Sequence, residues 1–167
     1  HIEAPYHFFP NGKFISELPL EIFFGPAILV DLRQVGLPNH EISLSELKTV
    51  GGLTEEIVRG KRVVLWTDWV SNNWNKPELY VNNPYLSQEA AEWLKDAEVV
   101  ALGVDFAVDG GPPYPNHTIF LGNEIPLIEN LMNLESIEAR EFTLIAFPLP
   151  VVGGDGSPAR VVAMCNE

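Results

Sequence analysis

The sequence predicts an α/β fold with a mixed β-sheet flanked by helices. Three apolar, strand-like runs at residues 27–32, 62–67 and 99–104 are separated by segments that carry helix-start signals, and this alternation is typical of α/β proteins. Two more strand-like runs, 142–147 and 159–164, are joined by a Gly-rich segment. These last two can pair as an antiparallel hairpin, which makes the sheet mixed.

The expected helices are placed by their capping signals. Ser43 has a glutamate three residues later, the spacing of a capping box, and Thr54 is expected to begin a second short helix. Ser87 precedes a run at 88–96 with acidic residues in its first turns, which favours a helix there. A proline can open a helix, so a last helix is expected over 126–137.

Two stretches are expected to be irregular. Residues 68–84 are rich in Asn, Trp and Pro and predict a long surface loop, which in a compact domain is often functional. The Gly/Pro-rich stretch 109–113 follows the third strand and is expected to stay irregular to about His117.

Composition bounds the class of protein. With 167 residues, 46% of them hydrophobic, the chain is expected to form a single domain over 1–167. Its 10 basic and 23 acidic side chains give a net charge of −13, which disfavours nucleic-acid binding. No apolar run approaches the roughly 20 residues of a membrane helix, so no membrane partner is expected. The single cysteine, Cys165, has no internal partner for a disulfide, as suits a cytoplasmic protein.

The first seven residues, His-Ile-Glu-Ala-Pro-Tyr-His, concentrate possible metal ligands. An extended backbone sends alternate side chains to one side, so His1, Glu3 and His7 can share a face. Pro5 favours an extended conformation for the residue before it. Imidazoles and a carboxylate are suitable ligands for a divalent metal. The alternatives are a frayed terminus or the remainder of an expression tag.

A second pair of candidates lies far along the chain. His117 follows the Gly/Pro-rich stretch, and loops after strands often carry binding residues. Glu129 is expected within the helix over 126–137, among apolar residues, and a carboxylate in such a place needs a partner. The alternatives are a solvated loop histidine and a helix-surface acid. His40 lies in a polar turn and is expected to take no part.

These segments, in this order, resemble the metal-dependent cyclase family that includes bacterial kynurenine formamidase and isatin hydrolase. The family carries the motif His-x-Gly-Thr-His-x-Asp-x-Pro-x-His, which residues 1–7 match from its second histidine onward. Separated segments continue the match over nearly the whole chain: Gly12-Lys13, Leu18-Pro19-Leu20, Gly25-Pro26-Ala27, Gly103-Val104-Asp105, Asp109, His117, Glu129-Asn130-Leu131, Asn133-Leu134, Pro148-Leu149 and 153–158.

The resemblance implies a cyclase-like α/β fold and a hydrolase that acts on an amide or lactam carbonyl. It implies that His1, Glu3, His117 and Glu129 hold a divalent metal, Zn²⁺ or Mn²⁺, and that His7 is the general base or proton shuttle. The implied substrate is a small aromatic amide or lactam, and the implied assembly is a homodimer or a larger homo-oligomer.

The chain also departs from the family pattern. Glu3 stands where the family usually has Asp, and the first histidine of the motif with its Gly-Thr would precede residue 1. We therefore expect the chain to lack the family's N-terminal segment. The alternative function is a non-catalytic binding or structural protein that keeps the fold with a degraded metal site.

Overall fold

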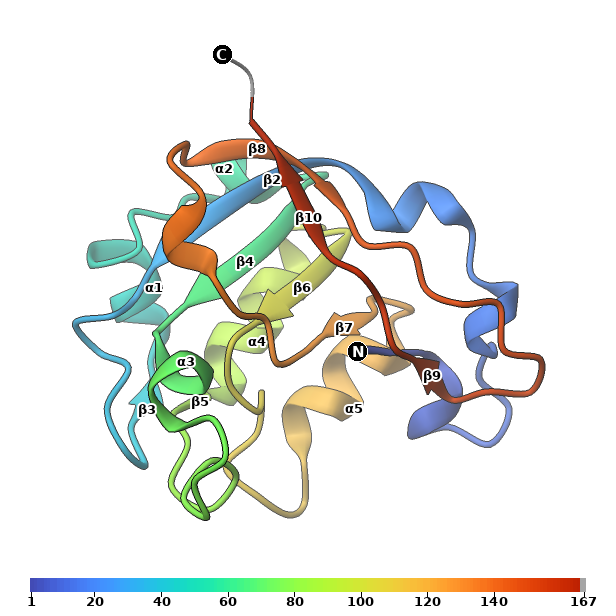
Figure 1. The fold of residues 1–167 in the computed structure, drawn as a ribbon, viewed down its shortest axis with the longest axis horizontal. Coiled ribbons are helices and arrows are strands. Elements are labelled where there is room, and N and C mark those ends of the chain that lie inside the picture. The colour runs from blue at the N-terminus through green and yellow to red at the C-terminus, as the bar shows by residue number, and fades with distance from the viewer. Residues whose placement is uncertain (166–167) are drawn as a thin grey trace.

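The computed structural model describes residues 1–165 and contains one large mixed sheet with helices packed against it (Figure 1). The eight strands follow the order β10-β8-β2-β4-β6-β7-β1-β9, and β3 and β5 form a separate two-stranded sheet. Strands β2, β4, β6 and β7 are parallel, whereas β1, β8, β9 and β10 pair antiparallel. The predicted α/β class with a mixed sheet is confirmed.

The strands are β1 Ile2–Glu3, β2 Phe24–Asp31, β3 Glu41–Ile42, β4 Arg62–Trp66, β5 Tyr85–Leu86, β6 Ala101–Val104, β7 Leu127–Ile128, β8 Glu141–Ile145, β9 Gly156–Ser157 and β10 Val162–Met164. The α-helices are α1 Leu44–Thr49, α2 Glu55–Val58, α3 Trp69–Asn73, α4 Gln88–Asp96 and α5 Pro115–Gly122. Four short 3-10 helices are Pro5–His7, Ile15–Glu17, Leu20–Phe23 and Leu134–Ser136.

The sheet has an apolar core on each face because its central strands are buried on both sides. In β2, Ile28 and Val30 pack with the buried residues of helices α1 to α5, while Ala27 and Leu29 pack with a second buried cluster. Near-continuous apolar strands of this kind are expected where both faces of a parallel sheet are covered. The capping signals that predicted α1, α2 and α4 are present as hydrogen bonds from their first turns.

The sheet curls so far that its two edge strands come from one short segment. Strand β9 pairs with β1 at one edge and β10 pairs with β8 at the other, although only residues 158–161 separate them. Figure 1 shows β10 crossing in front of β2 and β4 on its way from β9 to β8. The predicted antiparallel pairing of the last two strands is confirmed, and the Gly-rich segment between them contains β9.

Two expected elements near the candidate ligands are wrong. The helix over 126–137 is absent from the described residues: Leu127 and Ile128 form β7, which pairs with β6 and β1. Long-range strand pairing outweighs the local signal of the proline. The first seven residues are not one extended strand, because Pro5 opens a 3-10 helix and the His7 N–H donates to the Ala4 carbonyl at 2.9 Å.

Two further helices were missed. The expected loop 68–84 contains α3. Its Trp69 and Val70 are buried in the apolar core between the sheet and the helices. The stretch expected to be irregular up to His117 gives way to α5 at Pro115, so that His117 lies in the first turn of a helix. Within the described residues, none of the helices is long and apolar enough to cross a membrane.

The first strand is integrated into the core, which gives a stability test. Ile2 is fully buried, so Ile2→Ala is expected to lower the free energy of unfolding by about 2 to 5 kcal/mol through lost burial and a residual cavity. Urea unfolding measures this, with Leu20→Ala at an exposed position as the control, expected within about 0.5 kcal/mol of wild type. Equal effects of the two variants would show that the first strand is frayed.

Candidate metal centre

The register of β1 against β7 brings the N-terminal residue beside a residue 128 positions away. Ile2 pairs with Ile128, and the ladder continues through the Glu129 N–H, which donates to the His1 carbonyl at 3.0 Å. The His1 backbone nitrogen donates back to the Glu129 carbonyl at 3.3 Å. Figure 1 shows the N-terminus next to β7 and β9. Glu129 therefore follows a strand and is fixed by strand pairing, not by the expected helix.

Glu3 lies at the centre of a cluster that also contains His1, His7, His117 and Glu129. His1, which directly precedes β1, and Glu3, the last residue of β1, are two residues apart and share a face, as the alternation predicted. Glu3 Oε1 lies 3.3 Å from His1 Nε2 and 3.7 Å from His7 Nε2. Glu3 Oε2 lies 3.2 Å from His117 Nε2, which is 3.8 Å from Glu129 Oε1. The five residues expected at the site are thus brought together in the structure.

His117 is held in place by Asp109, whose role the sequence did not reveal. Asp109 Oδ2 lies 2.6 Å from His117 Nδ1 and also accepts the His117 backbone N–H at 3.0 Å. Asp109 Oδ1 accepts the N–H of Asn116 at 3.0 Å. A carboxylate can only accept, so Nδ1 carries a proton and Nε2 faces the cluster. Phe8 stacks on the same ring, 4.8 Å away between centroids.

One buried oxygen tests whether this cluster suits a cation. Glu3 Oε2 is buried and accepts no hydrogen bond from the described residues, and His117 Nε2 lies 3.2 Å from it. An unpaired buried carboxylate oxygen costs free energy. Ligand atoms of His1, Glu3 and Glu129 lie within 4.8 Å of one another, a span that a divalent cation with bonds of about 2.0–2.2 Å can bridge after small shifts. The residues present fit such an ion.

The charges in the cluster shift its pKa values in different directions. Burial, together with the neighbouring Glu3, raises the pKa of Glu129 to about 7. Burial opposes protonation of His117, but Asp109 and Glu3 outweigh it and raise its pKa to about 10. Burial alone would raise the pKa of Glu3, as it does for Glu129. The contacts of Glu3 with His1 and His117 instead lower this pKa to about 2. Without a metal, His117 is therefore protonated on both ring nitrogens at neutral pH. A cation that binds at Nε2 has to displace the proton there.

A cavity of ≈ 630 Å³ opens beside the cluster. His1 and Glu129 line one part of it, and apolar side chains that include Leu131, Phe142 and Leu144 line much of the rest. Its volume is in the range of small-molecule sites, which combine apolar walls with a few polar groups.

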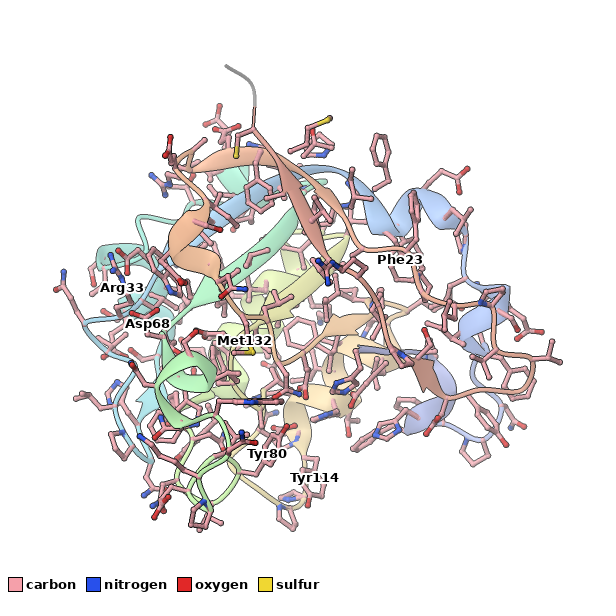
Figure 2. The ribbon with its side chains drawn as sticks, viewed as in Figure 1. Phe23, Arg33, Asp68, Tyr80, Tyr114 and Met132 are labelled. Carbon is pink, nitrogen blue, oxygen red and sulfur yellow. The ribbon has the colours of Figure 1, made fainter. Side chains whose placement is uncertain are left out.

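Three exposed side chains near the cluster are Met132, Tyr114 and Tyr80, which are labelled in Figure 2. Met132 lines the cavity, and the Tyr114 ring lies 6.0 Å from that of His117. The Tyr80 hydroxyl, from the long segment after α3, donates to Asn130 Oδ1 at 2.9 Å. That segment thus contacts the residue that follows Glu129.

The remaining histidine and the cysteine differ in their distance from the site. His40 is 2.9 Å from Glu46 in the cap of α1 and makes no contact with the cluster among the described residues. Cys165 is exposed and free, and it lines the cavity beside the cluster.

Asp109→Asn is expected to lower the pKa of His117 below about 10 in the metal-free protein. Burial lowers this pKa, so its rise depends on the hydrogen bond with Asp109. A histidine with a raised pKa stabilises the fold fully below the unfolded value of 6.5, and loses that contribution as pH rises through about 10. In Asp109→Asn, this stabilising contribution of His117 should be lost at a lower pH than in wild type.

NMR titration of the His117 ring and urea unfolding at a series of pH values measure both effects. Glu124→Gln, which removes an exposed carboxylate paired with Lys13, serves as the matched control and should leave both unchanged. A His117 pKa that stays the same in Asp109→Asn would contradict the assignment.

Comparison with known proteins places the chain in a family. The Cyclase family ("Putative cyclase") matches residues 1–109. The kynurenine formamidase of Geobacillus thermodenitrificans is 32% identical over 165 residues, which cover 96% of this chain and 72% of that protein. The chain therefore spans about 72% of the length of this relative.

Solved structures show the same fold. Isatin hydrolase A from Labrenzia aggregata, bound to benzyl benzoate, superposes with a TM-score of 0.83 at 27% identity, covering 99% of this chain and 72% of that one. A structure described as a potential metal-dependent hydrolase with cyclase activity gives a TM-score of 0.78 at 27% identity, covering 97% and 75%. The chain is thus a hydrolase acting on C–N bonds other than peptide bonds, and it belongs to the Cyclase family.

Proposed function

We propose that this protein hydrolyses the C–N bond of a small aromatic formamide or lactam, using a Zn²⁺ or Mn²⁺ ion held by His1, Glu3, His117 and Glu129. The observation that carries the proposal is the convergence of these side chains: ligand atoms of His1, Glu3 and Glu129 lie within 4.8 Å of one another. His117 Nε2 lies 3.2 Å from Glu3 Oε2, a buried oxygen that has no hydrogen-bond partner in the described part of the chain. Two imidazoles and two carboxylates form a donor set that suits either ion.

The substitution of Glu3 for the family's usual Asp is compatible with this role. Its longer side chain spans from His1 on one side to His117 on the other, at 3.3 and 3.2 Å. Its two oxygens therefore face different neighbours, and each can contact a cation placed between the two imidazoles. This geometry supports the hydrolase over the alternative of a degraded metal site.

His7 is proposed as the general base and proton shuttle. Its Nε2 faces Glu3, and its side chain is about one-third exposed (37%), so it can contact both the cluster and water. When bound, the ion supplies Lewis acidity, which activates a water molecule and polarises the carbonyl of the substrate. His7 accepts the proton that this water loses on attacking the carbonyl carbon. As the C–N bond breaks, His7 returns the proton to the leaving nitrogen.

The cavity beside His1 and Glu129 is the proposed place of the substrate. Apolar side chains such as Phe142 and Leu144 can contact an aromatic ring, polar ones such as Asn130 and Arg160 can bind its polar groups, and the volume of ≈ 630 Å³ accommodates a small molecule. The similarity to a kynurenine formamidase and to an isatin hydrolase supports a formamide or lactam as the bond that is cut. N-formylkynurenine and isatin are therefore the first substrates to test.

The proposed assembly is a homodimer or larger homo-oligomer in the cytoplasm. Exposed apolar side chains on and beside β2, β8 and β10 supply a surface that another copy can cover: Phe24, Phe147, Leu149, Val162 and Met164. Light scattering on the purified protein measures the number of copies.

Glu129→Gln and His117→Ala are each expected to lose most of the bound metal after dialysis, because each removes a proposed ligand. Elemental analysis of the dialysed protein measures the metal content. His40→Ala is the matched control, since it removes the one histidine outside the cluster, and it should retain metal. Undiminished metal in the first two variants would refute the ligand assignment, provided that thermal melting shows them folded.

His7→Ala is expected to retain the metal and to lower turnover by about 10²- to 10⁴-fold, the range for lost acid–base catalysis. Steady-state rates with N-formylkynurenine and isatin measure this effect, and His40→Ala again supplies the control. Full activity of His7→Ala would remove His7 from the proposed role. A wild-type protein that binds metal but cleaves neither a formamide nor a lactam would favour the non-catalytic alternative.

A further inference from the structure

The imidazole of His7 lies between two carboxylates. Its Nδ1 is 2.9 Å from Asp155 Oδ2, and its Nε2 is 3.7 Å from Glu3 Oε1. These two nitrogens are on opposite edges of the ring, so Asp155 approaches from the side away from the cluster. We propose that Asp155 is a positioning residue that holds His7 with its proton on Nδ1, leaving the Nε2 lone pair directed toward the reacting water.

The chemistry of the two groups carries this inference. In a neutral imidazole one nitrogen donates and the other accepts, and an ionised carboxylate only accepts. The 2.9 Å between Nδ1 and Asp155 is a hydrogen-bond distance, whereas the 3.7 Å between Nε2 and Glu3 is not. The contact at Nδ1 therefore selects the form that carries its proton there. A general base has to present an unprotonated nitrogen, and in this form that nitrogen is Nε2. The inference rests on the proposed function of His7.

The backbone around Asp155 fixes its place beside the first residues of the chain. The Asp155 carbonyl accepts the Ala4 N–H at 2.8 Å, and the Gly154 carbonyl accepts the Ile15 N–H at 3.0 Å. Strand β9 begins at the next residue, where Gly156 pairs with Glu3. Two segments some 150 residues apart are thus held together on both sides of the Asp155 side chain.

Two glycines show that this close approach is built into the sequence. A Cβ atom on Gly156 would collide with the carbonyl oxygen of Ile2. Gly153 has a φ of +71°, in the left-handed region that other residues rarely adopt. The Gly-rich segment between β8 and β10 therefore has a structural purpose: it lets Asp155 reach His7.

Asp155 differs from the carboxylates of the cluster in burial. Its side chain is 59% exposed, against 10% for Glu3. Its Oδ2 faces the outer edge of the His7 ring, away from the proposed ligands. It is therefore placed to orient His7 and not to hold a metal.

The test compares Asp155→Ala and Asp155→Glu with wild type in the Zn²⁺-loaded protein. The ¹⁵N chemical shifts of the His7 ring, recorded at a pH where imidazole is neutral, show which nitrogen carries the proton. Steady-state kinetics with the cleaved substrate give kcat and KM. The matched control is Glu124→Ala, which removes another exposed carboxylate that pairs with the N-terminal segment, at Lys13.

Asp155→Ala is expected to shift the His7 proton away from Nδ1 and to lower kcat by about 10- to 100-fold, the range for lost support of a site histidine. KM, metal content and thermal stability should stay near wild type, because Asp155 touches neither the proposed ligands nor the cavity. Asp155→Glu, which retains a carboxylate, should restore part of kcat and of the Nδ1–H signal. Glu124→Ala should resemble wild type throughout.

Unchanged ¹⁵N shifts and unchanged kcat in Asp155→Ala would overturn the proposal. A fall in kcat that comes with lost metal or a lowered melting temperature would also overturn it, because the role would then be structural. A wild-type protein without hydrolase activity would refute the proposed function, whereas the ¹⁵N shifts would still decide whether Asp155 sets the proton position on His7.

Discussion

The pairing of β1 with β7 is the constraint on which the site depends. This ladder is only two residues long, and it is extended by the reciprocal backbone contacts of His1 and Glu129. Neighbouring strands lie about 4.8 Å apart, which is why residues at the two ends of the pairing can reach one ion. The ladder is short, so the buried side chains of Ile2 and Ile128 supply much of what holds it in register.

The site concentrates charge at a place where charge is costly. Glu3 and Glu129 are almost completely buried, and their mutual repulsion contributes to the raised pKa of Glu129. Burying charges without full compensation lowers stability, yet Glu3 keeps an oxygen with no hydrogen-bond partner among the described residues. In known proteins, unfavourable arrangements of this kind are found mainly at functional sites. Positive charge at the centre of the cluster resolves the conflict, which accounts for the geometry better than a structural role does.

Local patterns predicted part of this structure, and the rest depends on contacts far apart in the sequence. The strands β2, β4 and β6 follow from apolar runs, and the face shared by His1 and Glu3 follows from simple alternation. Glu129 was expected on a helix because a proline precedes an apolar run, and only pairing with β1 and β6 makes that run a strand. Asp109 and Asp155 lie in segments that match the family, but their roles could not be predicted, because each acts on a histidine that folding brings to it.

The two histidine–carboxylate pairs differ in a way that fits two different tasks. His117 and Asp109 are both buried, and Asp109 is anchored further by backbone N–H groups of α5. A metal ligand benefits from such rigidity, because its lone pair has to stay aimed at one point. His7 and Asp155 are much more exposed, and a group that accepts and releases protons during turnover needs contact with water. The burial of each pair therefore matches the role proposed for it: fixed coordination for the buried His117–Asp109 pair, and proton transfer for the His7–Asp155 pair, which meets solvent.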